Sequence, residues 1–192
     1  MQEGQLVDLT DLIKMKIYDE EGAHVGHLQD LALDGDLSSP YASFIVVHLH
    51  WTDQVGEVEL GRPVEDIVLL MPWSCVASLE ENAVHLDERH PDFPVETARG
   101  KLLLRRDVLN KQMVDEEGNR LQRVDEVLIS REGKALRVAG LKVSRSWFSS
   151  GSNLQSLLER LRQKHEMRGD VEMIPWEAVR RVDGESIVIG TD

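Results

Sequence analysis

The chain has 192 residues, enough for one large domain or two small ones, and its 41% hydrophobic and 30% charged residues are typical of a globular protein. The formal net charge of -13 argues against a nucleic-acid partner, because affinity for phosphate backbones depends on Lys and Arg. One cysteine, Cys75, excludes an internal disulfide and a zinc site of several thiolates, and a reducing cytoplasm is the expected location.

The first predicted strand covers residues 12–18, where Ile13, Met15 and Ile17 alternate with lysines, so that one face can be buried. The next four residues, Asp19 to Gly22, predict a hairpin turn. An Asp at the start can accept hydrogen bonds from backbone amides, and the Gly tolerates a positive φ. Further strands are expected at residues 25–33, 42–51 and 64–71.

Residues 87–100 are mostly polar and contain Pro91 and Pro94, which is typical of a linker. We therefore expect a first module at residues 1–90, a linker at 91–98 and a second module at 99–192. Strands in the second module are predicted at residues 121–130, 136–144 and 171–174. Short strands at this spacing favour small barrels.

One segment of the second module has a helical pattern instead. Within residues 152–168, Leu154, Leu157 and Leu161 share one stripe, and the Ser at position 152 can cap the first turn. This amphipathic helix is expected either to pack over the second barrel or to offer its leucine stripe to a partner or a membrane surface.

The two modules repeat the same motifs. Tyr18-Asp19-Glu20-Glu21-Gly22 matches Val114-Asp115-Glu116-Glu117-Gly118, and Met71-Pro72-Trp73 matches Ile174-Pro175-Trp176. The two glycines are 96 residues apart and the two Pro-Trp pairs are 103 apart. The extra residues of the second copy are expected in the Ser-rich segment and the helix.

These repeated features resemble the PRC-barrel superfamily. The resemblance implies an all-β chain of two tandem PRC-type small β-barrels, with one amphipathic helix inserted in the second. The tandem arrangement is similar to the N-terminal region of proteins that carry MgtE-type intracellular and CBS domains, which are linked with divalent-metal transport. A protein-binding or regulatory module, without a cofactor, is therefore implied.

Candidate chemical sites are weak. His48 and His50 share one face of a predicted strand and could begin a metal site, but a third ligand is not identifiable. His24 and His27 are predicted to point to opposite faces. The acidic turns lack the ligand spacing of a calcium loop, and Cys75 is expected to be a buried structural thiol.

Charge is distributed unevenly between the modules. Residues 1–98 contain 4 Lys and Arg against 20 Asp and Glu, a charge of -16, whereas residues 99–192 have a charge of +3. This asymmetry serves either solubility or recognition of a basic partner. Direct membrane insertion is not expected, because the longest stretch without charged residues, 37–52, is too short to cross a bilayer.

The expected function is thus a non-enzymatic adaptor or regulatory module linked to divalent-metal transport. Its partner would be a basic protein or the cytoplasmic part of a transporter, and a homo-oligomer is compatible with the sequence. Two alternatives stay open. One is a ribosome-assembly factor that binds a basic ribosomal protein, and the other is an acidic metal-sensing module.

Overall fold

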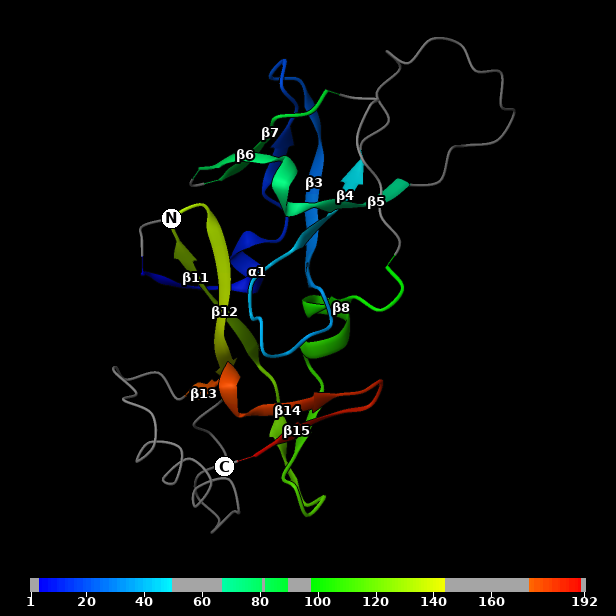
Figure 1. Cartoon of the computed structure of the whole chain (residues 1–192), viewed down its shortest axis with the longest axis vertical. Helices are drawn as coiled ribbons and strands as arrows, with labels where there is room; N and C mark the ends of the chain where they lie inside the picture. Colours follow the sequence, from blue (N-terminus) through cyan, green and yellow to red (C-terminus); the bar gives the residue numbers. More distant parts are fainter. Residues whose placement is uncertain (1–3, 50–66, 81, 90–97, 144–172, 191–192) are drawn as a thin grey trace, which may run out of the picture.

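The computed structural model describes residues 4–49, 67–80, 82–89, 98–143 and 173–190 (Figure 1). We call residues 1–90 the first repeat and residues 99–192 the second repeat. The elements of the first repeat are β1 (Leu6–Asp8), α1 (Leu9–Leu12), β2 (Lys16–Tyr18), β3 (His24–Leu33), β4 (Phe44–Leu49), β5 (Ile67–Pro72), η1 (Trp73–Cys75), β6 (Val76–Leu79) and β7 (Ala83–Leu86).

The second repeat has the same order of elements, except that two strands, β10 and β11, stand in the place of β3. Its elements are β8 (Leu102–Leu103), η2 (Leu104–Val108), β9 (Gln112–Val114), β10 (Arg120–Arg123), β11 (Glu126–Glu132), β12 (Ala135–Lys142), β13 (Met173–Pro175), η4 (Trp176–Ala178), β14 (Val179–Val182) and β15 (Ser186–Ile189). Each repeat therefore begins with a strand and a short helical turn, and each Pro-Trp pair leads into a second turn near its end.

The described residues are mainly β, as predicted. One sheet has seven strands in the order β5-β4-β3-β2-β7-β6, with β8 also paired to β3. Two four-stranded sheets have the orders β1-β11-β12-β13 and β10-β9-β15-β14. None of these sheets closes into a barrel, so the description as two PRC-type barrels stays a prediction.

The predicted strand at residues 121–130 is wrong in detail, because it is divided into β10 and β11. Between them, the amide of Val124 donates to Lys111 O and the amide of Asp125 donates to Lys142 O. The chain changes its hydrogen-bonding partner at this point, and the two strands consequently belong to different sheets. In the first repeat the equivalent strand, β3, is continuous.

The two repeats exchange their first strands. β1 pairs antiparallel with β11 of the second repeat, where Val7 lies opposite Ile129. In return, β8 pairs antiparallel with β3 of the first repeat, where Leu103 lies opposite Ala32. Figure 1 shows α1 beside β11 and β12, and β8 at the foot of β3. Each repeat therefore completes a sheet of the other.

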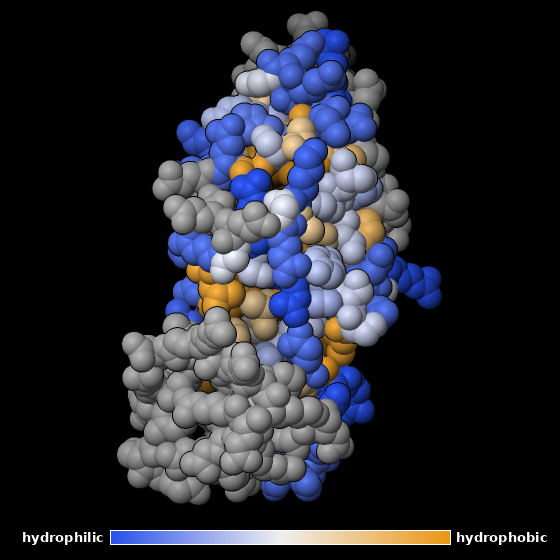
Figure 2. Space-filling model, turned by 60° about the vertical axis from the view of Figure 1, so that its left-hand side comes forward, coloured by the Kyte–Doolittle hydropathy of each residue, from blue (hydrophilic) through white to orange (hydrophobic). Residues whose placement is uncertain are grey.

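The core and the tryptophans also join the repeats. Buried side chains of both repeats form one contiguous cluster, while apolar side chains occupy only small separate areas of the face in Figure 2. Trp73 donates from Nε1 to Lys134 O at 3.1 Å, and Trp176 donates to Leu37 O at 3.0 Å. Each indole thus bonds to the other repeat, and the two tryptophans lie at equivalent points of the two copies.

Both predicted hairpin turns are present. Asp19 Oδ1 accepts from the amides of Glu21 at 3.1 Å and Ala23 at 2.8 Å, and Gly22 has φ +78°. In the second repeat, Asp115 accepts from the amide of Asn119 at 2.8 Å, and Gly118 has φ +83°. The local chemistry of the four-residue motif is sufficient to form each turn.

The predicted strand at residues 12–18 is only partly correct. Ile13, Met15 and Ile17 are buried as expected, but the strand is restricted to β2 because α1 extends to Leu12 and Lys14 has φ +79°. The left-handed residue interrupts the extended backbone, so the alternation of buried and exposed residues covers a longer segment than the strand itself.

Several predictions lie outside the described residues. They are the helix at 152–168 with Leu154, Leu157 and Leu161, the linker up to residue 97, and His50. Among the residues that are described, no helix is long and apolar enough to cross a membrane.

Candidate functional site

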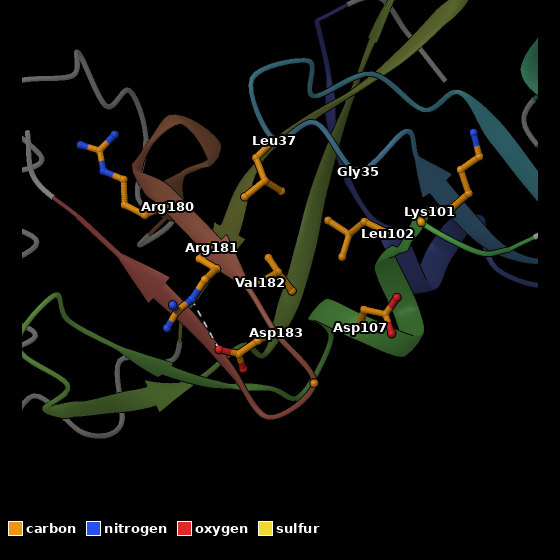
Figure 3. Close-up of a pocket in the computed structure, with 11 residues that line it drawn as sticks. Gly35, Leu37, Lys101, Leu102, Asp107, Arg180, Arg181, Val182 and Asp183 are labelled. Carbon is orange, nitrogen blue, oxygen red and sulfur yellow. Dashed lines mark ion pairs between the residues drawn. The ribbon is translucent and has the colours of Figure 1, made fainter.

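A pocket of about 410 Å³ lies where the two repeats meet (Figure 3). It is lined by the loop after β3, by residues 100–102 and Asp107 at the start of the second repeat, and by β14 with the turn that follows it. In Figure 3 the side chains of Leu37, Leu102 and Val182 turn towards the same space and form an apolar floor. We call this site the junction pocket, because its floor requires both repeats.

Charged residues also line the pocket, with the side chains of Lys101 and Arg180 pointing away from the floor in Figure 3. Ion pairs hold some of these residues in place: Lys101 with Asp34, Asp107 with Arg106, and Arg181 with Asp183. The backbone amides of Ser186 and Glu185, which donate to Asp183, lower the pKa of its carboxyl and keep it ionised. An apolar centre beside charged groups can receive a ligand or a partner side chain that has both apolar and polar parts.

Two buried carboxylates at equivalent positions connect the repeats beneath the surface. Asp30 accepts hydrogen bonds from the amide of Arg105 at 2.7 Å and from the amide of Arg106 at 3.2 Å, and it thereby holds η2 of the second repeat. Glu126, 96 residues later, accepts from the hydroxyl of Thr10 in α1 at 2.5 Å. Each carboxylate thus binds the short helix of the other repeat.

The environment of Asp30 makes it titratable near neutral pH. Only 4% of the residue is exposed, and burial raises the pKa of its carboxyl from 3.8 to about 6 against the opposing effect of its backbone hydrogen bonds. Desolvation penalises the charged form, and three amide donors do not fully compensate.

Replacing Asp30 by Asn should therefore change how stability depends on pH. Between pH 3.8 and about pH 6 the carboxyl of Asp30 is protonated more in the folded protein than in the unfolded chain. Its contribution to the free energy of unfolding is therefore lost as the pH rises through about 6. From pH ~4 to ~7 the unfolding free energy of Asp30→Asn should rise by about 2 kcal/mol relative to wild type, measured by urea titration.

Asp115→Asn is the matched control, because the hydrogen bond from Asn119 lowers the pKa of Asp115. Its contribution is present above the ordinary pKa of 3.8 and is lost only on further acidification, so between pH ~4 and ~7 the stability of this variant should run nearly parallel to that of wild type. Parallel pH profiles for wild type and Asp30→Asn would show that Asp30 has an ordinary pKa.

The histidines are arranged differently from the prediction. His48 lies opposite His27 in the β3–β4 pair. The expectation that His24 and His27 point to opposite faces is wrong, because their ring centroids are 5.1 Å apart. The register shifts here, with Ile17 opposite Gly26 and Tyr18 opposite His24. The intervening Val25 is therefore an extra residue in the strand, a β-bulge that brings both rings to one face.

Cys75 is buried, as predicted. Burial and the nearby Glu88 carboxylate raise the pKa of its thiol, which keeps it protonated and unreactive at neutral pH. Its sulfur and one carboxylate oxygen each of Asp87 and Glu88 lie within 4.8 Å of one another, the one such group of three among the described residues. Metal sensing by the acidic repeat stays a prediction.

No protein-family model matches this chain, and no curated protein shows significant similarity to it. The PRC-barrel resemblance therefore stays a prediction that rests on the turn and Pro-Trp motifs.

The structure assigns the motif residues to folding. Asp19, Gly22, Asp115 and Gly118 form turns, whereas Pro72, Trp73, Pro175 and Trp176 connect strands to tight helical turns. Sequence reasoning missed the residues of the junction pocket. Leu37, Leu102 and Val182 come from three distant segments, and no spacing signal links them.

Proposed function

We propose that the chain is a non-enzymatic adaptor that binds a partner protein through the junction pocket. The observation that supports this is the apolar floor of Leu37, Leu102 and Val182, which is built by both repeats and has charged residues beside it. An apolar side chain of the partner would enter the pocket, and polar groups beside it would meet these charged residues.

The partner that best fits the charge of the protein is a basic one. With a charge of -16, residues 1–98 would attract a Lys- and Arg-rich surface and accelerate association at low salt. We propose the cytoplasmic part of a divalent-metal transporter, as the PRC-barrel resemblance suggests. A basic ribosomal protein is the rival, and the identity of the bound protein distinguishes them.

Val182→Gln tests the pocket without adding a charge. We expect the variant to bind its partner about tenfold more weakly, because a polar amide on the floor opposes entry of an apolar side chain. The measurement is quantitative capture from native lysate with wild type and variant as baits, at low and at high salt. A basic protein that is captured by wild type and reduced with Val182→Gln is the expected result.

Val188→Gln is the matched control. Val188 is also half-buried and lies on the neighbouring strand β15, opposite Arg181, but it does not line the pocket. This variant should capture the partner as wild type does. Equal capture by wild type and Val182→Gln, at equal thermal stability, would exclude the junction pocket as the binding site.

A further inference from the structure

A second pocket, of about 320 Å³, lies on the first repeat and has a different chemical character. Ile13 and Leu28 provide an apolar base, and four side chains that carry or can accept positive charge line its sides: Lys14, His27, His48 and Arg105. They come from the loop before β2, from β3, from β4 and from η2 of the second repeat. We call this site the basic pocket.

The sheet places a further lysine beside these groups. In the β2–β3 pair Lys16 lies opposite His27, which in turn lies opposite His48 in the β3–β4 pair. Directly opposed residues of a sheet share a face, so Lys16 adds its charge to the same face as both imidazoles. The opposition of His27 and His48 orients two rings from neighbouring strands towards one pocket.

This concentration of positive charge contrasts with the rest of the first repeat. Residues 1–98 contain only four Lys and Arg, and two of these, Lys14 and Lys16, lie at this face. Solubility alone does not require that the few basic residues of this repeat lie around one pocket. A local field that attracts anions is the physical consequence, within a molecule whose overall charge repels them.

The backbone at Lys14 is unusual. Lys14 has φ +79°, and the equivalent residue of the second repeat, Asn110, has φ +63°. Asn adopts this left-handed conformation readily, whereas for Lys it costs on the order of 1 kcal/mol. The first repeat therefore keeps a cation where another residue type would be more stable, which indicates a role other than folding.

Arg105 is held at the pocket by its own backbone. Its amide donates to Asp30 Oδ1 at 2.7 Å, which links η2 to β3. The equivalent position of the first repeat is Thr10, which contacts Glu126 as Arg105 contacts Asp30, so the second repeat's own pocket has no arginine counterpart to Arg105. The charges of Lys14 and Arg105 are therefore not matched at the equivalent positions of the second repeat.

We propose that the basic pocket binds a small oxyanion, a phosphate or carboxylate group carried by a small molecule. The ammonium of Lys14 and the guanidinium of Arg105 supply charge-assisted hydrogen bonds, and the imidazoles supply further donors. The apolar base of Ile13 and Leu28 receives the non-ionic part of the ligand. This inference does not rest on the adaptor function, since the junction pocket has other lining residues.

Lys14→Asn is the decisive variant, because it places at this position the residue that the second repeat already has. It removes one charge but is compatible with the left-handed backbone, so its thermal midpoint should equal or exceed that of wild type. The full chain is titrated separately with inorganic phosphate and with acetate at constant ionic strength and followed by NMR. The backbone amide chemical shifts of His27, His48 and Arg105 should change and reach saturation. Lys14→Asn should weaken the tighter of the two by about tenfold.

Asn110→Lys is the matched control, since it adds a lysine at the equivalent left-handed position outside the basic pocket. It should leave the affinity for either anion unchanged. The anion with the lower dissociation constant, phosphate or acetate, identifies the group that the pocket prefers. Unsaturable shifts with both anions, or equal affinities in wild type and Lys14→Asn, would overturn the proposal while leaving the capture experiment unaffected.

Discussion

Residues 1–98 and residues 99–192, produced as separate polypeptides, should each fail to fold and should form the native structure when mixed. Fragment 1–98 would lack β8, which pairs with its β3, and fragment 99–192 would lack β1, which pairs with its β11. Each would also expose core side chains of its short helix, which are Leu9 and Leu12 in α1 and Leu104 and Val108 in η2.

The expected effect is large because burying one such aliphatic side chain contributes about 1.5 to 3 kcal/mol, against a total stability of about 5 to 15 kcal/mol for a domain. Folding of each fragment and of the equimolar mixture is measured by circular dichroism and by amide NMR spectra. The fragment 1–110 is the control: it carries β8 and η2 itself and should be more ordered than 1–98. Dispersed spectra for 1–98 and 99–192 alone would show two independent modules.

Trp176→Ala should lower the free energy of unfolding by about 3 to 5 kcal/mol, the range for deletion of a large core aromatic. Trp176 is 1% exposed and packs in the cluster that contains both repeats. The substitution also leaves Leu37 O without its indole donor. Urea unfolding followed by circular dichroism measures the change.

Trp73→Ala is the natural comparison, because Trp73 occupies the equivalent position but is only partly buried. It donates to Lys134 O as Trp176 does to Leu37 O, so the two variants lose the same type of hydrogen bond. The loss of stability should be clearly smaller for Trp73→Ala, since less apolar surface leaves the core. A loss below ~1 kcal/mol for Trp176→Ala would contradict its place in the core.

Sequence reasoning succeeded where the controlling contacts are close along the chain. The turn at Asp19 depends on amides two and four residues ahead, and the alternation of Ile13, Met15 and Ile17 follows from the geometry of an extended chain. The repeat was recognisable for the same reason, because both copies need the same local turn chemistry.

The basic pocket was only partly predictable. His48 was recognised as a candidate ligand, but its neighbour in the structure is His27, on another strand. The β-bulge at Val25 also reversed the predicted facing of His24 and His27, because one extra residue shifts every later side chain to the other face. Nothing in a Lys residue signals the left-handed backbone of Lys14.

The sequence by itself determined the repeated turns, the apolar alternation and the uneven charge. Only the tertiary structure decided that β1 pairs with β11 and that β8 pairs with β3. Because the two repeats carry similar patterns, the first strand of either copy matches both sheets locally, and pairing within or between copies cannot be distinguished by pattern. The choice depends on contacts such as those of Asp30 with η2 and Glu126 with Thr10, which join residues more than 70 positions apart and exist only once the whole core is assembled.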